Sequence, residues 1–375
     1  MSFRSARLGE RRRFLRTAAR ALLVAAGSSW IPGALAQTGP LGVSAGRSAT
    51  KIRGFPFDSL DSYLTPTSRF FLRSHLEIPR LDPGGFRVQI GGWVERPFSL
   101  SLAELSRIPA ESCTATFECS GNGVAGGFVS TAEWTGPLLA PLLERARVRS
   151  GAMELLMEGA DAGLDEHVPV PVQYARSVPL STVGRIPAVL AMKMNGEPLL
   201  PEHGYPLRAV LPGQYSLQNV KWLVRITVLP KPYRGFYETQ RYVEMRRLPD
   251  GIRVQEIEKM RIKSQIARIV PRSEAGQGAY RITGAAWSGG DGVRQVEVSM
   301  DGGRSWRPAA LGESRGSYAW TLWSYDWSGA RPGVYEVMAR ATDGLGRSQP
   351  ITRDSRVLTG YVNNWCEPKR LTVPA

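Results

Sequence analysis

The sequence predicts an α+β region followed by a β-sandwich. Between about residues 56 and 260, short strand-like and helix-like patterns follow one another without a repeating βαβ rhythm. From about residue 261 onward, short alternating segments are separated by Gly/Asp turns at intervals of roughly 8–12 residues, which is the spacing typical of a sandwich. The 375 residues of the chain are enough for two domains and a sizeable buried core.

The N-terminus predicts an export signal. The basic segment RRRFLR at residues 11–16 precedes the apolar run ALLVAAG and then an A-x-A cleavage site that ends at Ala36. Two arginines followed by Phe-Leu indicate the twin-arginine route. We expect residues 1–36 to be a twin-arginine signal peptide, residues 37–55 to be a flexible lead-in, and the protein to be periplasmic. The alternative is a basic amphipathic helix that stays attached. Because the twin-arginine route carries folded proteins, it favours an enzyme that acquires its cofactor before export.

The chain is basic, with a formal net charge of +15 that falls to +9 once residues 1–36 are removed. No basic run is interleaved with aromatic residues, so we expect no nucleic-acid partner. A basic periplasmic protein instead favours anionic small molecules and acidic protein partners. After the predicted signal, no apolar run reaches the length of about 18 residues that a membrane span needs, so we expect no span in the mature protein.

Local patterns define the elements of the first region. Ser101 is the expected N-cap of a short helix that Pro109 ends, and Asn195-Gly196 is a dipeptide favoured in tight hairpin turns. The predicted strands are residues 86–94, 113–119, 188–199 with their central turn, 205–213 and 220–229, and the predicted helices are residues 101–109 and 134–148.

The second region contains only strand patterns. Trp306, Trp323 and Trp327 lie in or beside these strands, where packing is the expected role of tryptophan. The predicted strands are residues 281–289, 293–303, 305–311, 318–327, 333–344 and 346–355.

The segment TFECSGNGVAGGF, residues 116–128, supports two different functions. Gly121, Gly123 and Gly126 form the G-x-G-x-x-G pattern of a dinucleotide-binding loop. Such a loop must open directly into a helix, whereas the following GGFVSTAEW is a poor helix start. The pattern therefore gives only weak support for a nicotinamide cofactor, and the chemistry of this segment is expected to lie with Cys119.

Cys119 has three candidate roles. The sequence contains three cysteines, Cys113, Cys119 and Cys366, so at least one is unpaired. The even spacing of Cys113 and Cys119 places them on one face of a strand, too far apart to bridge. Cys119 is then a buried structural thiol, a nucleophile that would need a histidine base, or a soft thiolate ligand to a metal whose other ligands come from a cofactor.

Several separated motifs together resemble the sulfite oxidase family of molybdopterin enzymes, and most of all its bacterial sulfite and sulfane dehydrogenases. They are FFLRSHLEIPRLDPGGFRVQIGG, TFECSGNG, MKMNGEPLLPEHGYPLRAVLPG and NVKWL, in this order along the chain. GAAWSGGDGVRQVEVSMDGGRSW and RATDGLGRSQP resemble that family's C-terminal dimerisation sandwich. The resemblance implies a sulfite-oxidase-type molybdopterin-binding catalytic domain over residues 56–260 and an immunoglobulin-like dimerisation sandwich over residues 261–375, in a homodimer or a heteromer.

The resemblance also implies a molybdenum cofactor and the residues that bind it. Cys119 matches the cysteine that binds the metal. Arg73 matches an arginine near the metal and the substrate oxyanion, and Tyr233 in PYRGF matches an active-site tyrosine. The residues that match positions holding the pterin and its phosphate are His75, Asp161, His203, Arg208 and Lys221.

The sequence departs from the family where the substrate anion binds. Gly123 and Val124 stand where animal sulfite oxidases have two arginines, and Thr359 stands where a further arginine is expected. The resemblance implies oxidation of sulfite or a related sulfur compound, with electrons passed to a c-type cytochrome, and these departures leave the sulfur substrate open. The alternatives are a molybdopterin-dependent S- or N-oxide reductase and a non-catalytic assembly subunit.

Overall fold

The computed structural model describes residues 51–374 except 258, 273 and 275. The predicted signal peptide and most of the predicted lead-in lie outside these residues. The α-helices in the described part are short: α2 (Leu102–Leu105), α3 (Leu139–Ala146) and α4 (Leu180–Val183). As predicted, Ser101 caps α2, and a capping box with Glu104 satisfies two backbone N–H groups at the helix start.

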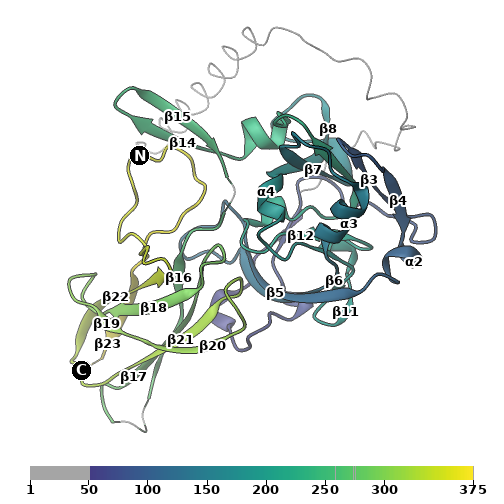
Figure 1. Cartoon of the computed structure of the whole chain (residues 1–375). Helices are drawn as coiled ribbons and strands as arrows, with labels where there is room; N and C mark the ends of the chain where they lie inside the picture. Colours follow the sequence, from purple (N-terminus) through teal and green to yellow (C-terminus); the bar gives the residue numbers. More distant parts are fainter. Residues whose placement is uncertain (1–50, 258, 273, 275, 375) are drawn as a thin grey trace. The chain divides into compact units, whose positions relative to one another are not determined.

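A five-stranded sheet forms the first layer of the α+β region that precedes the sandwich (Figure 1). Its strand order is β4-β3-β13-β7-β8, and β13 pairs in parallel with β3 and antiparallel with β7. The apolar face of α3, including Leu139 and Leu142, packs on the buried side of the sheet against residues such as Val88 and Ile90. The strands are β3 (Arg87–Gly92), β4 (Phe98–Ser101), β7 (Glu154–Leu164), β8 (Pro171–Pro179) and β13 (Leu223–Leu229).

A four-stranded sheet with the order β11-β10-β6-β5 forms a second layer. It buries Phe117 and Trp134, whose rings stack with centroids 4.8 Å apart. Asn195 and Gly196 form the predicted hairpin turn with φ angles of 52° and 84°. The strands are β5 (Ala110–Glu118), β6 (Val129–Pro137), β10 (Lys193–Met194) and β11 (Glu197–Pro198).

Several small elements lie around these two sheets. The paired strands are β1 (Ile52–Arg53) with β2 (Leu72–Arg73), β9 (Val189–Ala191) with β12 (Arg208–Val210), and β14 (Val243–Leu248) with β15 (Gly251–Glu256). The single turns of 3₁₀ or π geometry are η1 (Phe57–Ser59), η2 (Thr67–Arg69), η3 (Pro201–His203), η4 (Ser216–Gln218) and the π-turn η5 (Tyr237–Arg241).

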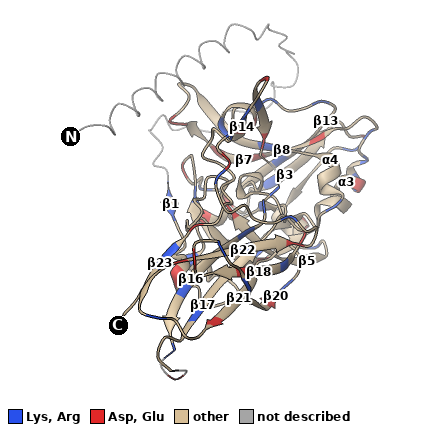
Figure 2. Cartoon of the chain, turned by 90° about the vertical axis from the view of Figure 1, so that its left-hand side faces the viewer, with Lys and Arg blue, Asp and Glu red and all other residues tan. Residues whose placement is uncertain are grey.

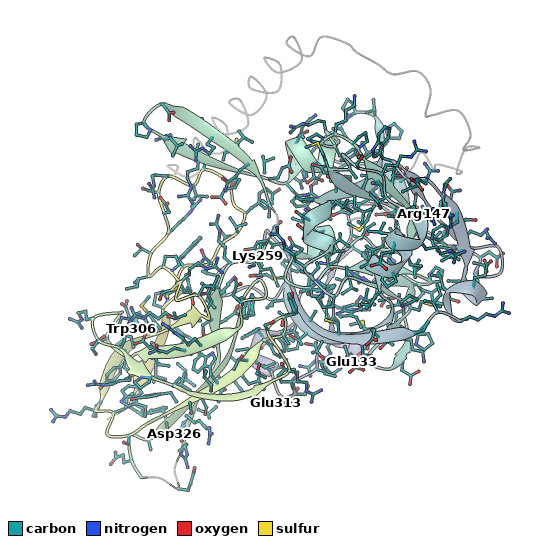
Figure 3. All side chains as sticks on the ribbon, viewed as in Figure 1. Glu133, Arg147, Lys259, Trp306, Glu313 and Asp326 are labelled. Carbon is teal, nitrogen blue, oxygen red and sulfur yellow. The ribbon has the colours of Figure 1, made fainter. Side chains whose placement is uncertain are left out.

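Two four-stranded sheets form the sandwich, with the orders β16-β17-β21-β20 and β19-β18-β22-β23. Trp323 is buried between them, and Trp327 packs against the same core, in the packing role that was predicted. Trp306, labelled in Figure 3, lies under the guanidinium of Arg340. The strands are β16 (Lys263–Pro271), β17 (Tyr280–Trp287), β18 (Val293–Ser299), β19 (Arg307–Pro308), β20 (Ala310–Ser314), β21 (Thr321–Trp327), β22 (Gly333–Asp343) and β23 (Lys369–Val373).

The α+β region followed by a β-sandwich is confirmed, but one predicted strand is wrong. Residues 346–355 form no extended strand and contribute only an isolated bridge between Thr342 and Ser348. The Asp343 carboxylate accepts hydrogen bonds from the backbone N–H groups of Leu345 and Arg347 and so closes a tight turn here. The sandwich edge is formed instead by β23, which no predicted segment covers.

Charge is spread over many elements. Figure 2 shows Lys and Arg positions interspersed with Asp and Glu along the described chain. None of the helices in that part combines the length and the apolar character that crossing a membrane requires.

A buried ion pair joins the sandwich to the α+β region. Lys263 of β16 and Glu118 of β5 have side chains that are 0% and 2% exposed, and Lys263 Nζ lies 2.8 Å from Glu118 Oε1. Asn122 Nδ2 and the indole N–H of Trp287 also donate to this carboxylate, at 3.0 and 2.9 Å. Both carboxylate oxygens are therefore satisfied by donors from distant parts of the chain.

Replacing Lys263 with Met should lower the free energy of unfolding by about 3–5 kcal/mol, because it leaves the Glu118 carboxylate buried without its counter-ion. Urea unfolding followed by tryptophan fluorescence measures the change. The matched control is Lys259→Met, since Lys259, labelled in Figure 3, pairs with Asp291 with its side chain 45% exposed. The control should lose less than about 1 kcal/mol. Equal losses in the two variants would contradict a special role for the buried pair.

Candidate active site

One cavity gathers most of the predicted site residues. Residues from seven separate segments of the chain line it, so only the folded structure brings them together. The predicted site residues among those that line it are Arg73, His75, Cys119, Asp161, His203, Arg208 and Lys221.

The Cys119 thiol lies at the end of a strand, directly after β5. Its backbone N–H donates to the carbonyl of Phe128 at 2.9 Å, and its own carbonyl accepts from the N–H of Asn122 at 2.8 Å. All three cysteines are unpaired. Burial raises the pKa of Cys119, so the bare thiol is held protonated and needs a positive partner, such as a metal ion, to become a thiolate.

The glycines after Cys119 serve the packing of the loop rather than a nucleotide. A Cβ on Gly126 would lie 2.2 Å from Asn122 Oδ1, and one on Gly127 would lie 2.2 Å from the carbonyl oxygen of Phe55. The loop runs on into strand β6 and not into a helix, as the sequence predicts. Gly126 and Gly127 therefore make room for neighbouring protein atoms.

Two cations line the cavity, the buried Arg208 and the half-buried Lys221. Arg208 is at the start of β12, and Lys221 directly precedes Trp222 and β13. Burial lowers the pKa of Lys221, and the nearby charge of Arg208 lowers it further. Burial raises the pKa of Asp161, the one carboxylate that lines the cavity. Asp161 is thus one carboxylate against two cations, and a bound phosphate would supply further negative charge.

Backbone carbonyls hold these cations in place. Lys221 Nζ donates to the carbonyls of Arg73 and Glu202 at 3.3 and 3.2 Å. The guanidinium of Arg208 donates to the carbonyls of His203 and Asn219 at 2.9 and 3.1 Å. Carbonyl partners position a cation without neutralising it, so the positive charge remains available to an anionic group.

Arg73 and His75 line the part of the cavity near Cys119. Arg73 is half-buried at the end of β2, and its guanidinium makes no hydrogen bond or ion pair with any described residue. His75 Nε2 is hydrogen-bonded to the Tyr242 hydroxyl, which lines the same cavity. Burial, together with the charges of Arg73 and Arg241, lowers the pKa of His75 to about 3, so this imidazole is neutral at physiological pH.

Tyr233 is the predicted site residue that the structure does not place in this group. It does not line the cavity, and its backbone N–H donates to Glu154 Oε2 at 2.8 Å. Tyr174 and Tyr242 are the tyrosines that line the cavity. The segment turns through the π-turn η5 after PYRGF, which brings Tyr242 inward. A local motif match cannot predict this turn.

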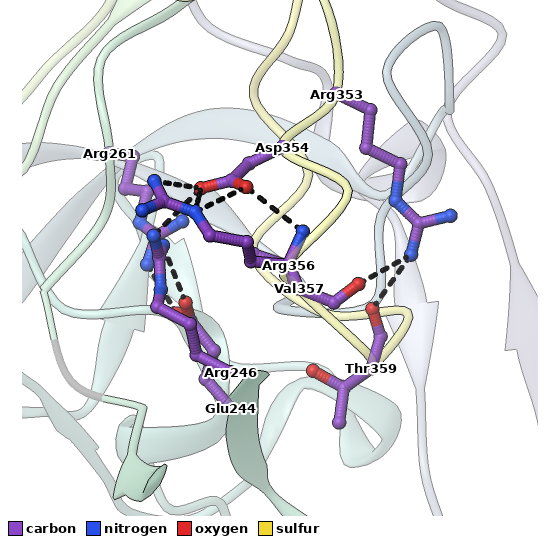
Figure 4. Close-up of polar contacts among 8 residues, drawn as sticks. All are labelled: Glu244, Arg246, Arg261, Arg353, Asp354, Arg356, Val357 and Thr359. Atoms are coloured by element: carbon purple, nitrogen blue, oxygen red, sulfur yellow. Dashed lines mark hydrogen bonds and ion pairs between the residues drawn. The ribbon is translucent and has the colours of Figure 1, made fainter. Parts of the chain in front are cut away.

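The positions of the expected arginines are filled by uncharged groups. The carbonyl of Gly123 accepts from Lys263 Nζ at 2.8 Å, and Val124 lines a different cavity, beside β16. Thr359 lies in the C-terminal loop, where its carbonyl accepts from Arg353 at 3.3 Å (Figure 4). Its hydroxyl is buried without a partner among the described residues.

Ion pairs anchor this C-terminal loop to the hairpin β14–β15 and its surroundings. Arg246 donates to Asp354 at 2.7 Å and to Glu244 at 3.1 Å, and Arg261 also donates to Glu244 (Figure 4). The N–H of Val362 donates to the carbonyl of Ser120, next to Cys119, at 2.7 Å. The loop therefore contacts the residue next to Cys119, a contact that sequence reasoning missed because the two segments are more than 200 residues apart in the chain.

The residues present fit a molybdopterin cofactor. Arg208 Nε and Asp161 Oδ1 are buried without partners in the described part of the chain, so they remain available to the polar edges of a ligand. A Cβ on Gly159 would lie 2.3 Å from Asp161 Oδ1, so glycine keeps this carboxylate accessible. The cations match a phosphate, and Cys119 supplies one soft ligand for a metal. This fold and donor set define a molybdopterin oxidoreductase.

Comparison with known proteins identifies the family. The sequence family described as an oxidoreductase molybdopterin binding domain matches residues 75–237, and the one described as a Mo-co oxidoreductase dimerisation domain matches residues 254–369. The chain is 32% identical over 328 residues to the sulfite oxidase of Gallus gallus, covering 77% of this chain and 69% of that protein. The chain therefore belongs to the sulfite oxidase family of molybdopterin enzymes.

Further relatives agree with this assignment. The chain is 34% identical over 292 residues to the mitochondrial sulfite oxidase of Rattus norvegicus, covering 70% of this chain and 53% of that protein. It thus spans about half the length of the rat enzyme. The crystal structure of the sulfane dehydrogenase SoxCD from Paracoccus pantotrophus matches with a TM-score of 0.76 and 28% identity, covering 93% of this chain and 94% of that one.

Replacing Lys221 with Met should weaken cofactor retention about 10- to 100-fold, because it removes hydrogen bonds from a charged donor to the phosphate. Molybdenum per chain, measured by mass spectrometry after extended dialysis, reports the loss. Lys193→Met is the matched control, since Lys193 is an exposed lysine of β10. A Lys221→Met protein that keeps its molybdenum as the control does would remove Lys221 from the cofactor site.

Proposed function

We propose that this protein is a periplasmic molybdenum-dependent oxidoreductase that oxidises sulfite or a related anionic sulfur compound and passes the electrons to a c-type cytochrome. The observation that carries this proposal is the guanidinium of Arg73. It lines the same cavity as Cys119, and it forms no ion pair with a described residue. A half-buried guanidinium without a protein anion favours binding of an anion, and its planar donors suit an oxyanion of sulfur.

The residues of the cavity divide into two groups by role. Arg208 and Lys221 hold the phosphate of the pterin at one end, and Asp161 and His203 contact its polar edges. At the other end, Cys119 binds the metal and Arg73 orients the substrate. The bound cofactor supplies the two-electron redox centre. For sulfite the balanced reaction converts one sulfite and one water into one sulfate, two protons and two electrons.

Arg73 is suited to assist this reaction as well as to bind the anion. Its charge is fixed at any physiological pH, because a guanidinium does not lose its proton. A donor that is already in place when negative charge shifts between oxygen atoms stabilises the transition state without reorganisation. The imidazole of His75, which is bonded to Tyr242, is neutral and adds no charge of its own to this part of the cavity.

The location and the electron acceptor in this proposal follow from other features of the sequence. The RRRFLR segment and the A-x-A site support export of the folded protein by the twin-arginine route. The chain contains no C-x-x-C-H motif for haem attachment, so the electrons pass to a carrier outside these residues. A c-type cytochrome is the carrier that we propose, because it accepts electrons singly in the periplasm.

Replacing Cys119 with Ser should lower sulfite oxidation by at least about 100-fold, more than the 10- to 100-fold that is typical of losing an outer-shell partner of a metal site. The assay follows ferricyanide reduction by sulfite, and circular dichroism checks that the fold is retained. Cys113→Ser is the matched control, because Cys113 is a half-buried unpaired thiol of the same strand, β5. An active, metal-loaded Cys119→Ser protein would disprove the assignment.

The same protein preparation tests the direction of the reaction. Oxidation of a sulfur anion by ferricyanide supports the proposal. Turnover of a sulfoxide with reduced viologen, in the absence of sulfite oxidation, would instead support an S-oxide reductase. A protein that carries about one molybdenum per chain contradicts a purely structural role.

A further inference from the structure

We propose that one face of the hairpin β14–β15 is the docking surface for the protein that accepts the electrons, and that this partner presents an apolar patch with an acidic rim. The inference rests on the function proposed above, in which the electrons leave to a separate carrier. Neither strand of the hairpin belongs to a motif that identifies the family. The two strands can be followed in Figure 1.

The C-terminal loop extends the hairpin by a third row. The N–H of Arg247 in β14 donates to the carbonyl of Arg356 at 2.8 Å, and the N–H of Leu358 donates to the carbonyl of Met245 at 2.9 Å. The residues between these two bonds form an antiparallel bridge. Strand β14 is therefore paired on both edges, with β15 on one side and the C-terminal loop on the other.

This register places six side chains on one face, called the docking face below. Directly opposite residues of an antiparallel pair lie on the same face, and so do residues two positions apart in one strand. Val254 of β15 is opposite Met245, and Ile252 is opposite Arg247. The bridge to the C-terminal loop aligns two further residues with them. The side chains of the docking face are Met245, Arg247, Ile252, Val254, Arg356 and Leu358.

The docking face is largely apolar and open to water. Ile252 and Val254 are 52% and 55% exposed, and Leu358 is 39% exposed. Arg247 and Arg356, in the same row as Ile252, are exposed as well. Neighbouring apolar side chains that stay exposed on one face of a sheet indicate an interaction site, and apolar residues combined with arginine are typical of protein interfaces.

Ion pairs beside the docking face leave an excess of positive charge. Arg246 donates to both Asp354 and Glu244 (Figure 4). Arg356 also donates to Asp354, and Arg261 also donates to Glu244. Three arginines therefore share two carboxylates, and one positive charge of this group is not compensated.

The other charged groups near the docking face add to this excess. The guanidinium of Arg353 donates to backbone carbonyls, which do not neutralise it, and Arg247 forms no ion pair with a described residue. Glu256, at the base of β15, is paired with Arg234 at 3.6 Å. The exposed Asp250 in the hairpin turn opposes these charges only in part. A partner that meets the docking face therefore gains from carboxylates around its own apolar patch.

The docking face begins at the wall of the cavity. Strand β14 starts directly after Tyr242, which lines the cavity, and Met245 lies about 10 Å further along the strand. In the C-terminal loop, Leu358 shortly precedes Tyr361, whose ring lies against that of Tyr242 with centroids 5.4 Å apart. Both segments that build the face lead from the cavity, so a carrier docked there lies near the site that releases the electrons.

An acidic electron carrier fits the docking face better than a second copy of this chain. In a twofold contact between two identical faces, the arginines of both copies enter one interface, and like charges oppose association. The chain contains no C-x-x-C-H motif for haem attachment, so the proposed reaction needs a separate carrier.

The test uses two forms of one electron carrier that differ in charge. Native cytochrome c is basic, and succinylation of its lysines makes the same protein acidic. Sulfite oxidation by the molybdenum-loaded enzyme is followed with each form for the wild type, Arg247→Glu and Val254→Asn. With the succinylated form, kcat/KM should fall about 10-fold in Arg247→Glu and at least about threefold in Val254→Asn, as expected for interface positions.

Two further readouts separate docking from chemistry. With native cytochrome c, kcat/KM should rise in Arg247→Glu, because the charge of the docking face is reversed. With ferricyanide, kcat should stay at the wild-type value in both variants, because neither side chain lines the cavity. Added salt should lower the wild-type kcat/KM with the succinylated form more steeply than that of Arg247→Glu.

Arg294→Glu and Val334→Asn are matched controls outside the docking face. Arg294 is an exposed arginine of β18, and Val334 is a valine of β22 that is 55% exposed, as Val254 is. Both controls should keep the wild-type kcat/KM with the succinylated form. An equal fall in Arg294→Glu and Arg247→Glu would indicate a general effect of net charge and would overturn the inference.

Two other results would overturn it as well. One is a wild-type enzyme that reduces ferricyanide but reduces the succinylated cytochrome no faster than the native form. The other is self-association of the wild type in sedimentation velocity that Val254→Asn abolishes without changing the cytochrome kinetics, which would assign the docking face to a second copy of the chain.

The two proposals fail in different ways. A loaded wild-type enzyme that oxidises no sulfur anion with ferricyanide would disprove the proposed function and with it the docking role. Full ferricyanide activity in every variant, with cytochrome kinetics that do not depend on Arg247 or Val254, would disprove only the docking face.

Discussion

The buried ion pair between Lys263 and Glu118 is the interaction on which the position of the metal-binding cysteine depends. Glu118 is the last residue of β5, and Cys119 follows it directly. Lys263 Nζ also donates to the carbonyl of Gly123 at 2.8 Å, so one ammonium group fixes both ends of the first turn of the loop. Because burying two charges costs about as much free energy as their attraction returns, the pair contributes more to the geometry of the loop than to net stability.

This geometry makes the sandwich a support for the loop that carries Cys119. Its strand β16 supplies Lys263, and its strand β17 supplies Trp287, which also donates to Glu118. Further contacts join the two regions, since the hydroxyl of Tyr63 donates to the carbonyl of Trp320 and the indole of Trp320 donates to the carbonyl of Tyr63. A domain that family comparisons describe by dimerisation therefore has a second role within a single chain.

Sequence reasoning succeeded where the determining interactions are local. The cap at Ser101, the turn at Asn195 and the alternation of the sheet strands depend on residues a few positions apart, and all three are present in the structure. It failed for residues 346–355, where the carboxylate of Asp343 closes a turn in a segment whose alternation is typical of a strand. The strand β23 was missed although it pairs with β22, because about 25 residues without a strand separate the two. The strand β16 pairs with the next strand, β17, and was missed because no predicted segment covers residues 263–271.

The same distinction applies to the site. The ordered motifs predicted seven residues that line one cavity, because a motif can be matched from neighbouring residues alone. Tyr242 lines the cavity and carries no motif, and its position follows from the π-turn η5, whose geometry depends on tertiary packing. The role of Tyr233 stays a prediction, because the residue lies outside the lining of the cavity.

The positive side chains that line the cavity remain charged in two different ways. Where the pterin phosphate would bind, Arg208 and Lys221 are held by backbone carbonyls, and Asp161 is the one carboxylate among the described residues that line the cavity. Burial opposes their charges, so the site is least stable when empty, and a bound anion stabilises the fold by mass action. At the substrate end the anion comes and goes in each turnover, so a permanently charged group must tolerate an empty site. In the proposed function the guanidinium of Arg73 suits this task, because guanidinium groups keep their proton and are weakly hydrated.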